Sequence, residues 1–383
     1  MHSPLATPCN RLHTATLPGQ QPAGADNLED VVSGLWDRIL ERGAAARGAS
    51  ILDLKVGVLR VHRLFAEIEK VTGVALPITV MFQAPTLEKL IASVRLGHAP
   101  AAETLAELKG GDGAPLFIFP GIGGVALELV ELARLIRYGG PVYANQPRGL
   151  DGREPPDRSI ADMAAYQFAV IKSAQPHGPY RLAGYSFGGL LAIEAARLLV
   201  EAGETVDFLG LIEPALPERQ WHLPARLEFF WRRLKHHAKA LRSLSRSEII
   251  SYLTSHGETV LGRLLRLFGA GHVGPSPYHR EGLPLNLAET RAAGWAAVQS
   301  HQLKPYPGKA TLFVSEKGDP LGCNILMVFP RYLQEWDERR FSGDHAGMLR
   351  EPHVRQLAHQ ISGCLAEIDS KTPHHQGKGD RTK

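Results

Sequence analysis

The chain has 383 residues, of which 44% are hydrophobic and 21% are charged, as in ordinary globular proteins. Its 43 basic and 39 acidic side chains leave a formal net charge of +4, without the basic cluster that a dedicated nucleic-acid binder would carry. This length fits one large domain with a smaller one beside it.

The cysteine content and the lengths of the apolar runs indicate the cellular compartment of the protein. The three cysteines, Cys9, Cys323 and Cys364, are too scattered for a disulfide framework or a CxxC metal site, so we expect no bound metal. We find no signal segment and no run of about 18 apolar residues that could span a bilayer. The sequence therefore predicts a cytoplasmic protein that contacts neither membranes nor nucleic acids.

The first part of the chain changes from a polar leader to helical patterns. Residues 1–27 are rich in Pro, Thr, Gln, Ala and Gly without periodicity, and we expect a disordered leader there and a disordered tail at 369–383. From 28 to 97, apolar residues recur at three- and four-residue steps. They predict helices through 31–40 and 59–68 and a shorter one after Pro85-Thr86, which together form a small all-α bundle.

Residues 98–114, with their Gly-Gly-Asp-Gly stretch, are expected to be a linker, and residues 115–368 a second domain. In this domain short apolar strands alternate with helices, which predicts a parallel sheet with helices on both faces. The expected strands are 116–119, 141–144, 180–183, 208–212 and 311–314, and the expected helices are 127–136, 160–171, 190–199 and 354–368.

Between about 217 and 300 the alternation stops, and helical stretches such as 249–253 and 260–268 mix aromatic with basic residues. We interpret this stretch as a helical lid inserted into the sheet domain. Its aromatic and apolar side chains are expected to close over Ser186, while Arg232, Arg233, Lys235 and Lys239 face outward.

The strongest motif is Gly-Tyr-Ser-Phe-Gly at 184–188, between a predicted strand and a predicted helix. This is the setting of a nucleophile elbow, in which a serine lies on a cramped turn at the N-terminus of a helix. Ser186 is thus the predicted nucleophile. The oxyanion formed during attack needs two N–H donors, which we assign to Phe187 and to Ile122 in the Gly-rich turn 120–124. That turn lacks the GxGxxG spacing of a dinucleotide site.

A nucleophilic serine needs a base and an acid that orients the base. His345, in the turn Gly-Asp-His at 343–345, follows the last strand region and precedes the closing helix, as the chain order of such triads requires. Two acids are possible: Glu213 follows the strand 208–212, and Asp319 follows the strand 311–314. Asp207 lies at the wrong end of its strand. These residues alone do not decide between Glu213 and Asp319.

Residues 115–368 resemble the type I thioesterase domains of nonribosomal peptide synthetases. The resemblance rests on Gln-Pro-Arg-Gly-Leu at 146–150, Gln-Pro-His-Gly-Pro-Tyr at 175–180, the elbow at 184–189 and Gly-Asp-His at 343–345. It implies an α/β-hydrolase fold, a doubly wound sheet with a helical lid. In that family the acid follows the strand after the elbow, which selects Glu213, although the family usually has aspartate there.

Residues 28–97 resemble the peptidyl carrier domain that precedes such thioesterases, as in Phe-Gln-Ala-Pro-Thr at 82–86. The family attaches phosphopantetheine to a serine in an Asp-Leu-Gly-Gly-x-Ser run, which here reads Asp-Leu-Lys-Val-Gly-Val and ends at Val58. Valine has no hydroxyl, and Ser50 is out of register, so this half is expected to stay without the cofactor. Even the leader faintly resembles the tail of an adenylation domain, as if the chain were the surviving end of a longer synthetase.

The resemblance implies an enzyme that forms an acyl-Ser186 intermediate, with an acyl- or peptidyl-carrier protein as its partner in trans and a small acyl group as its substrate. The substrate would arrive on the phosphopantetheine of that other carrier, with no cofactor bound covalently to this chain. Two alternatives stay open: a non-catalytic docking module left from a synthetase terminus, and a general carboxylesterase with the same triad.

Overall fold

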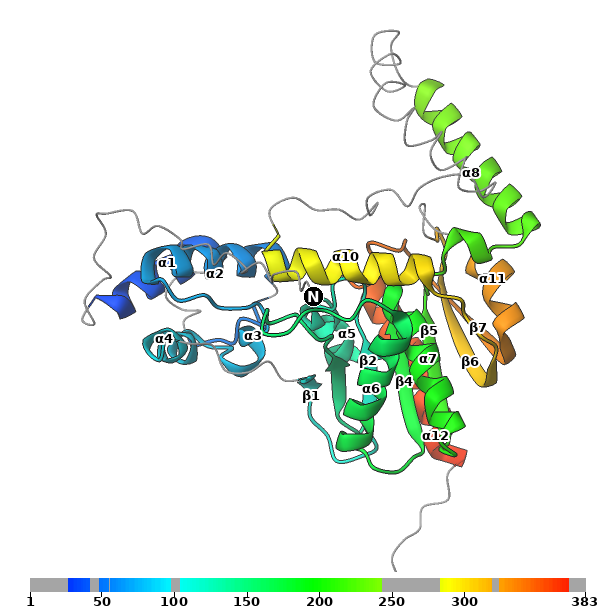
Figure 1. The fold of residues 1–383 in the computed structure, drawn as a ribbon, viewed down its shortest axis with the longest axis horizontal. Coiled ribbons are helices and arrows are strands. Elements are labelled where there is room, and N and C mark those ends of the chain that lie inside the picture. Colours follow the sequence, from blue (N-terminus) through cyan, green and yellow to red (C-terminus); the bar gives the residue numbers. More distant parts are fainter. Residues whose placement is uncertain are drawn as a thin grey trace, which may run out of the picture.

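A computed structural model describes residues 27–41, 48–54, 56–97, 104–242, 283–318 and 324–371, except for the side chains of 236, 237 and 239–242 (Figure 1). Within these ranges a small helical bundle precedes a larger sheet domain. The predicted helices at 249–253 and 260–268, the leader and most of the tail lie outside the described residues.

The bundle contains the three predicted helices and a short one between them. Their apolar positions converge on one core, in which Trp36, Leu64 and Ile68 are fully buried. Thr86 begins the last helix, because its hydroxyl accepts a hydrogen bond from the Lys89 N–H at 3.4 Å. The helices are α1 (Leu28–Leu40), α2 (Val58–Thr72), α3 (Val80–Gln83) and α4 (Leu87–Arg95).

The larger domain is built on one sheet, whose seven described strands follow the order β1-β3-β2-β4-β5-β6-β7. All neighbours are parallel except β1 and β3. The strands are β1 (Leu105–Lys109), β2 (Leu116–Phe119), β3 (Val142–Asn145), β4 (Tyr180–Tyr185), β5 (Val206–Ile212), β6 (Tyr306–Ser315) and β7 (Leu333–Phe341).

Helices cover both faces of the sheet, as predicted. Helices α6 (Ile160–Ala174) and α7 (Phe187–Glu201) pack together on one face over a core that includes Phe117, Leu182 and Leu211. On the other face, α5 (Val130–Leu135) packs against α12 (His353–Lys371). The remaining short elements are η2 (Ala126–Leu129), η3 (Glu218–Gln220), α11 (Ile325–Val328) and η4 (Phe329–Tyr332).

The two edge strands were not predicted. The expected linker 98–114 contains β1, which pairs antiparallel with β3 in the register Leu105 to Asn145. In β7, five of nine residues are charged, and the sequence therefore has no apolar alternation. One side of an edge strand is exposed to solvent, so the strand needs few apolar residues. Its pairing therefore depends on the neighbouring strand and not on apolar alternation in its own sequence.

The bundle is docked on the sheet domain. Val125, Leu150 and Leu287 of the sheet domain belong to the same buried apolar cluster as the bundle core. At the rim, the Arg134 guanidinium lies 2.6 Å from the Asp53 carboxylate and donates to the Leu52 carbonyl at 3.0 Å. The loop before α2 thus faces the sheet domain.

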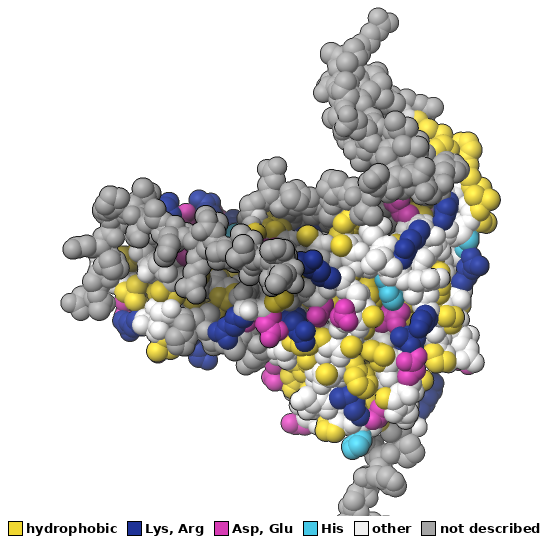
Figure 2. All heavy atoms as spheres, viewed as in Figure 1, with side chains coloured by type: hydrophobic (Ala, Val, Ile, Leu, Met, Phe, Trp, Pro, Cys, Tyr) yellow, Lys and Arg dark blue, Asp and Glu magenta, His cyan; other side chains and the backbone are white. Residues whose placement is uncertain are grey.

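Two helices of the insertion are described, and they behave differently. Helix α10 (Leu285–Ser300) runs from the bundle across the sheet domain, whereas α8 (Leu223–Arg242) projects away from it (Figure 1). Leu223, Leu227, Trp231 and Leu234 are exposed along α8, at an apolar edge visible in Figure 2.

The face shown in Figure 2 intermixes basic and acidic side chains instead of gathering one sign in a patch. None of the helices in the described ranges is both long and apolar enough to cross a bilayer.

Candidate active site

Ser186 lies on a sharp turn between the end of β4 and the first residue of α7. Its backbone has φ 54° and ψ −117°, a conformation that L-residues rarely adopt. The flanking glycines make the turn possible: a Cβ at Gly184 would overlap the backbone of Gly188, and one at Gly188 would overlap the carbonyl oxygen of Phe119. The motif therefore forms the elbow predicted from the sequence.

His345 lies beside this serine. Its Nε2 is 3.0 Å from Ser186 Oγ, and both side chains are buried. The ring stacks on Tyr185, with ring centroids 5.3 Å apart, and the Tyr185 hydroxyl donates to the His345 carbonyl at 2.9 Å. Asp344 holds the following turn, because its carboxylate accepts from the Gly347 N–H at 2.8 Å.

Glu213 follows β5 and reaches the other nitrogen of the same imidazole. Its Oε2 lies 3.4 Å from His345 Nδ1, and its Oε1 accepts from the N–H and the hydroxyl of Ser315 at 2.8 and 2.7 Å. The carboxylate is 3% exposed, so these donors replace the water that it loses. The distance to His345 is long for a hydrogen bond, as catalytic contacts often are before substrate binds.

The other acidic candidates for the triad are Asp207 and Asp319. Asp207 is the second residue of β5, at the opposite end of the sheet, where its carboxylate lies 3.3 Å from the Arg181 guanidinium. Burial raises the pKa of Asp207, and Arg181 only partly offsets this effect. Asp319 lies outside the described residues. Of the acids that the structure describes, Glu213 is the one placed beside His345.

The two predicted oxyanion donors lie on elements that meet at Ser186. Phe187 is the first residue of α7, where backbone N–H groups have no partner inside the helix. Ile122 is in the turn 121–124, closed by a 2.9 Å hydrogen bond from Gly124 N to the Gly121 carbonyl. Helix α10 passes over both, since a Cβ at Gly294 would lie 3.4 Å from Phe187 and 3.6 Å from Ile122.

Of the predicted lid, the structure describes residues 217–242 and 283–300. Trp221 and Phe229 are buried in the core on the α6 and α7 face, and Trp231 is 56% exposed. Helix α8 thus does not carry its aromatic side chains over Ser186; within the described residues, α10 covers the site. Of the four cations expected to face outward, Lys235 is exposed, Arg232 and Arg233 are half-buried, and the Lys239 side chain lies outside the described residues.

Sequence reasoning missed the residues that support this site. Tyr185 stands inside the elbow motif but its stacking on His345 has no sequence signature, and Ser315 is an ordinary polar end of a buried strand. Both act across distant segments of the chain, so only the tertiary structure reveals them.

The carrier resemblance predicts the attachment position at Val58, which is the first residue of α2. Its side chain is half-buried and packs against the cluster shared by the bundle and the sheet domain. It offers only methyl groups where phosphopantetheine would need a hydroxyl. These residues do not fit the cofactor.

The elbow, the strand order and the helices on both faces define an α/β-hydrolase fold. A family model described as "Thioesterase domain" matches residues 114–363. The chain therefore belongs to the thioesterase domain family.

The chain is similar to parts of much longer proteins. It is 35% identical over 192 residues to an indigoidine synthase of Dickeya dadantii (strain 3937), a match that covers 50% of this chain and 13% of the relative. It is 36% identical over 149 residues to the nonribosomal peptide synthetase btyA of Aspergillus terreus (strain NIH 2624 / FGSC A1156), covering 38% of this chain and 16% of the relative. The matched region is thus a small part of each relative.

Among solved structures, a four-domain nonribosomal peptide synthetase, holo-AB3403 bound to AMP and glycine, aligns with a TM-score of 0.52 at 20% identity. The alignment covers 94% of this chain and 27% of that one, so the shared fold includes the bundle.

Proposed function

We propose that this protein is a serine thioesterase that releases an acyl or peptidyl group from a carrier-bound phosphopantetheine thioester, through an acyl-Ser186 intermediate. The observation that carries the proposal is the 3.0 Å contact between Ser186 Oγ and His345 Nε2, with Glu213 on the other side of the ring. A serine, an imidazole and a carboxylate in this order are the parts that nucleophilic acyl transfer requires.

In the proposed reaction, Ser186 Oγ attacks the thioester carbonyl carbon while His345 Nε2 takes the hydroxyl proton. The N–H groups of Phe187 and Ile122 stabilise the negative charge on the carbonyl oxygen. The carbon–sulfur bond then breaks, and His345 gives its proton to the leaving thiolate. A water molecule attacks the acyl-serine, His345 takes a proton from it, and the free acid leaves as Ser186 recovers its hydrogen. Glu213 stabilises the imidazolium in both steps.

The proposed partner is an acyl- or peptidyl-carrier protein that acts in trans, in secondary metabolism of the nonribosomal peptide or polyketide type. Val58 supports action in trans, because the bundle has no hydroxyl at the attachment position. Several similar proteins are named as nonribosomal peptide synthetases, which supports a carrier-bound substrate over a free ester.

The nucleophile is tested with a fluorophosphonate probe and intact-protein mass spectrometry. The wild-type chain should gain one probe mass on Ser186, and Ser186→Ala should gain none. Full labelling of Ser186→Ala would overturn the proposed role.

The substrate is tested with octanoyl-phosphopantetheinyl carrier protein, followed by mass spectrometry of the carrier. We expect loss of the octanoyl group with the wild-type chain but not with Ser186→Ala. Hydrolysis of p-nitrophenyl octanoate with no effect on the loaded carrier would favour a carboxylesterase. Absence of both reactions and of labelling would favour a docking module.

A further inference from the structure

We propose that Arg291 of α10 is a positioning residue that holds the oxyanion loop in its working conformation; this inference rests on the proposed function. Arg291 is half-buried, and its Nη1 donates to the Ile122 carbonyl at 2.8 Å. A Cβ at Gly123 would lie 2.9 Å from Arg291 Cγ, so the arginine stem lies directly against the backbone of the loop.

Three consecutive peptide units of the loop each have a partner. The Gly121 N–H donates to Glu128 Oε1 at 2.5 Å, the Gly121 carbonyl accepts from Gly124 N at 2.9 Å, and the Ile122 carbonyl accepts from Arg291. In a trans peptide the C=O and N–H point in opposite directions. With the Gly121 carbonyl turned toward Gly124, the Ile122 N–H points out of the turn.

Of the three groups that contact the loop in this way, Arg291 is the one that lies in the insertion between residues 217 and 300. The turn itself contains Gly123 and Gly124, with φ of 103° and 68°. Glycine has no Cβ, so its backbone φ and ψ angles change more easily than those of other residues. Without Arg291, the peptide between Ile122 and Gly123 can rotate about its flanking bonds and displace Gly124. This weakens the hydrogen bond from Gly124 N to the Gly121 carbonyl, which fixes the direction of the Ile122 N–H. A preorganised donor stabilises the oxyanion because it needs no reorientation during the reaction.

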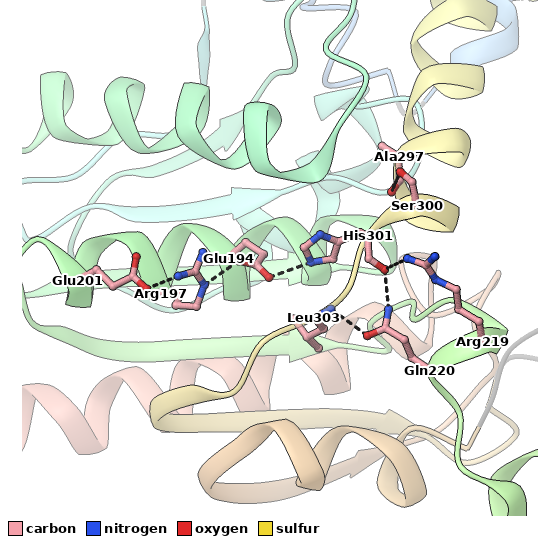
Figure 3. A network of polar contacts seen from close by, with 9 residues as sticks. All are labelled: Glu194, Arg197, Glu201, Arg219, Gln220, Ala297, Ser300, His301 and Leu303. Atoms are coloured by element: carbon pink, nitrogen blue, oxygen red, sulfur yellow. Dashed lines mark hydrogen bonds and ion pairs between the residues drawn. The ribbon is translucent and has the colours of Figure 1, made fainter.

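Arg291 can hold the loop because both ends of α10 are fixed. At its start, Leu287 is buried in the cluster of the bundle, and Asn286 Nδ2 donates to the Leu150 carbonyl at 2.6 Å. Just beyond its end, His301 Nε2 lies 2.9 Å from Glu194 Oε1, and the His301 carbonyl accepts from Gln220 Nε2 at 2.8 Å (Figure 3). The carrier-like bundle thereby helps to position the helix that carries Arg291.

The test compares Arg291→Met, Arg291→Lys and wild type, with S-octanoyl-N-acetylcysteamine as the substrate and octylboronic acid as a serine-directed tetrahedral mimic. Arg291→Met should lower kcat roughly 10- to 100-fold, less than the loss of an oxyanion donor itself. The boronate Ki should rise by a similar factor, and KM should stay within about twofold because only the tetrahedral state uses the loop fully. Arg291→Lys should recover part of the loss, since an ammonium can also donate to the Ile122 carbonyl.

The matched control is Arg340→Met, which removes an exposed arginine of the edge strand β7 that pairs with Glu338, away from α10 and the loop. It should leave kcat and the boronate Ki near wild type. If Arg291→Met unfolds below the assay temperature, Arg291→Gln is used instead, because its amide is too short to reach Ile122. Wild-type kcat and Ki in the variant that folds would overturn this inference alone. A wild-type chain that does not hydrolyse the thioester would instead overturn the proposed function.

Discussion

At the scale of single residues, the candidate site combines strained backbone with close packing. Among the non-glycine residues that the structure describes, Glu41, Ser186 and Glu213 have positive φ. Two of the three therefore belong to the proposed triad. Such conformations cost free energy and persist only where the surroundings enforce them, and they concentrate at functional sites.

Glu213 is expected to be the orienting acid. Glu213→Ala should lower kcat by about 10⁴-fold, because His345 would lose the group that holds its tautomer and stabilises its charge. Asp319→Ala should change kcat only mildly. Steady-state hydrolysis of an acyl thioester measures both, and the reverse ranking would move the acid to the strand β6.

The elbow glycines make a separate stability prediction. Gly188→Ala should lower the free energy of unfolding by about 1–3 kcal/mol, because the added methyl group overlaps the Phe119 carbonyl oxygen. Gly363→Ala is the matched control: it lies in the helix α12 with open space around it, and should stabilise by roughly 0.5–1 kcal/mol. Urea unfolding measures both, and equal effects would show that the elbow is not tightly packed.

At the scale of elements, the end of α10 is tied to α7, the helix that begins at the nucleophile. Glu194 on α7 is 4% exposed and contacts both His301 and Arg197 at 2.9 Å (Figure 3). Burial alone would raise the pKa of Glu194, but its hydrogen bonds with His301 and Arg197 outweigh burial and leave the pKa below its ordinary value.

This contact predicts a stability that depends on pH. Because the pKa of Glu194 is lower in the folded protein than the ordinary 4.5, its contribution is fully present above about pH 4.5 and is lost as the pH falls through the folded value. Glu194→Gln should thus destabilise by about 1–3 kcal/mol at pH 6, and the difference from wild type should shrink at pH 3.

Glu201→Gln controls for the loss of a carboxylate next to Arg197. Its exposed ion pair should contribute less than about 1 kcal/mol. Denaturant unfolding at both pH values gives the comparison, and a Glu194→Gln difference that is constant with pH would contradict the pKa argument.

At the scale of the whole molecule, the bundle has a carrier-like fold and is docked on the sheet domain. Val58, where the carrier resemblance predicts the attachment position, is half-buried against the cluster shared with the sheet domain, and Arg134 binds the loop before α2. We therefore expect the surface around Val58 to help join the two domains and not to present a phosphopantetheine arm.

The bundle is expected to remain without phosphopantetheine. Incubation with a promiscuous phosphopantetheinyl transferase and coenzyme A should leave the intact mass unchanged, because Val58 has no hydroxyl. A separate, intact carrier domain should gain the cofactor in the same reaction. Val58→Ser alone should not restore loading fully, since Lys55 and Val56 replace the glycines of the recognition turn. A mass gain mapped to Ser50 would show that the carrier resemblance is misaligned.

The sequence by itself determined the class of fold and predicted the nucleophile, because both depend on local patterns. The elbow needs glycines within two residues of Ser186, and the alternation of strands and helices is written in short apolar runs. The bundle helices likewise follow from spacing at three and four residues. His345 was found from its place in the chain order, and Glu213 was selected over Asp319 only through the family resemblance.

Tertiary structure decided what depends on contacts between distant segments. The edge strands β1 and β7 exist because a neighbouring strand supplies their hydrogen bonds, and Ser315 supports Glu213 across 102 positions of sequence. The placement of the insertion was decided in the same way: α8 projects away from the sheet domain (Figure 1), whereas α10 is anchored at both ends and passes over the oxyanion loop. Local patterns record which faces must be buried, whereas the partner that buries them is fixed by packing of the whole chain.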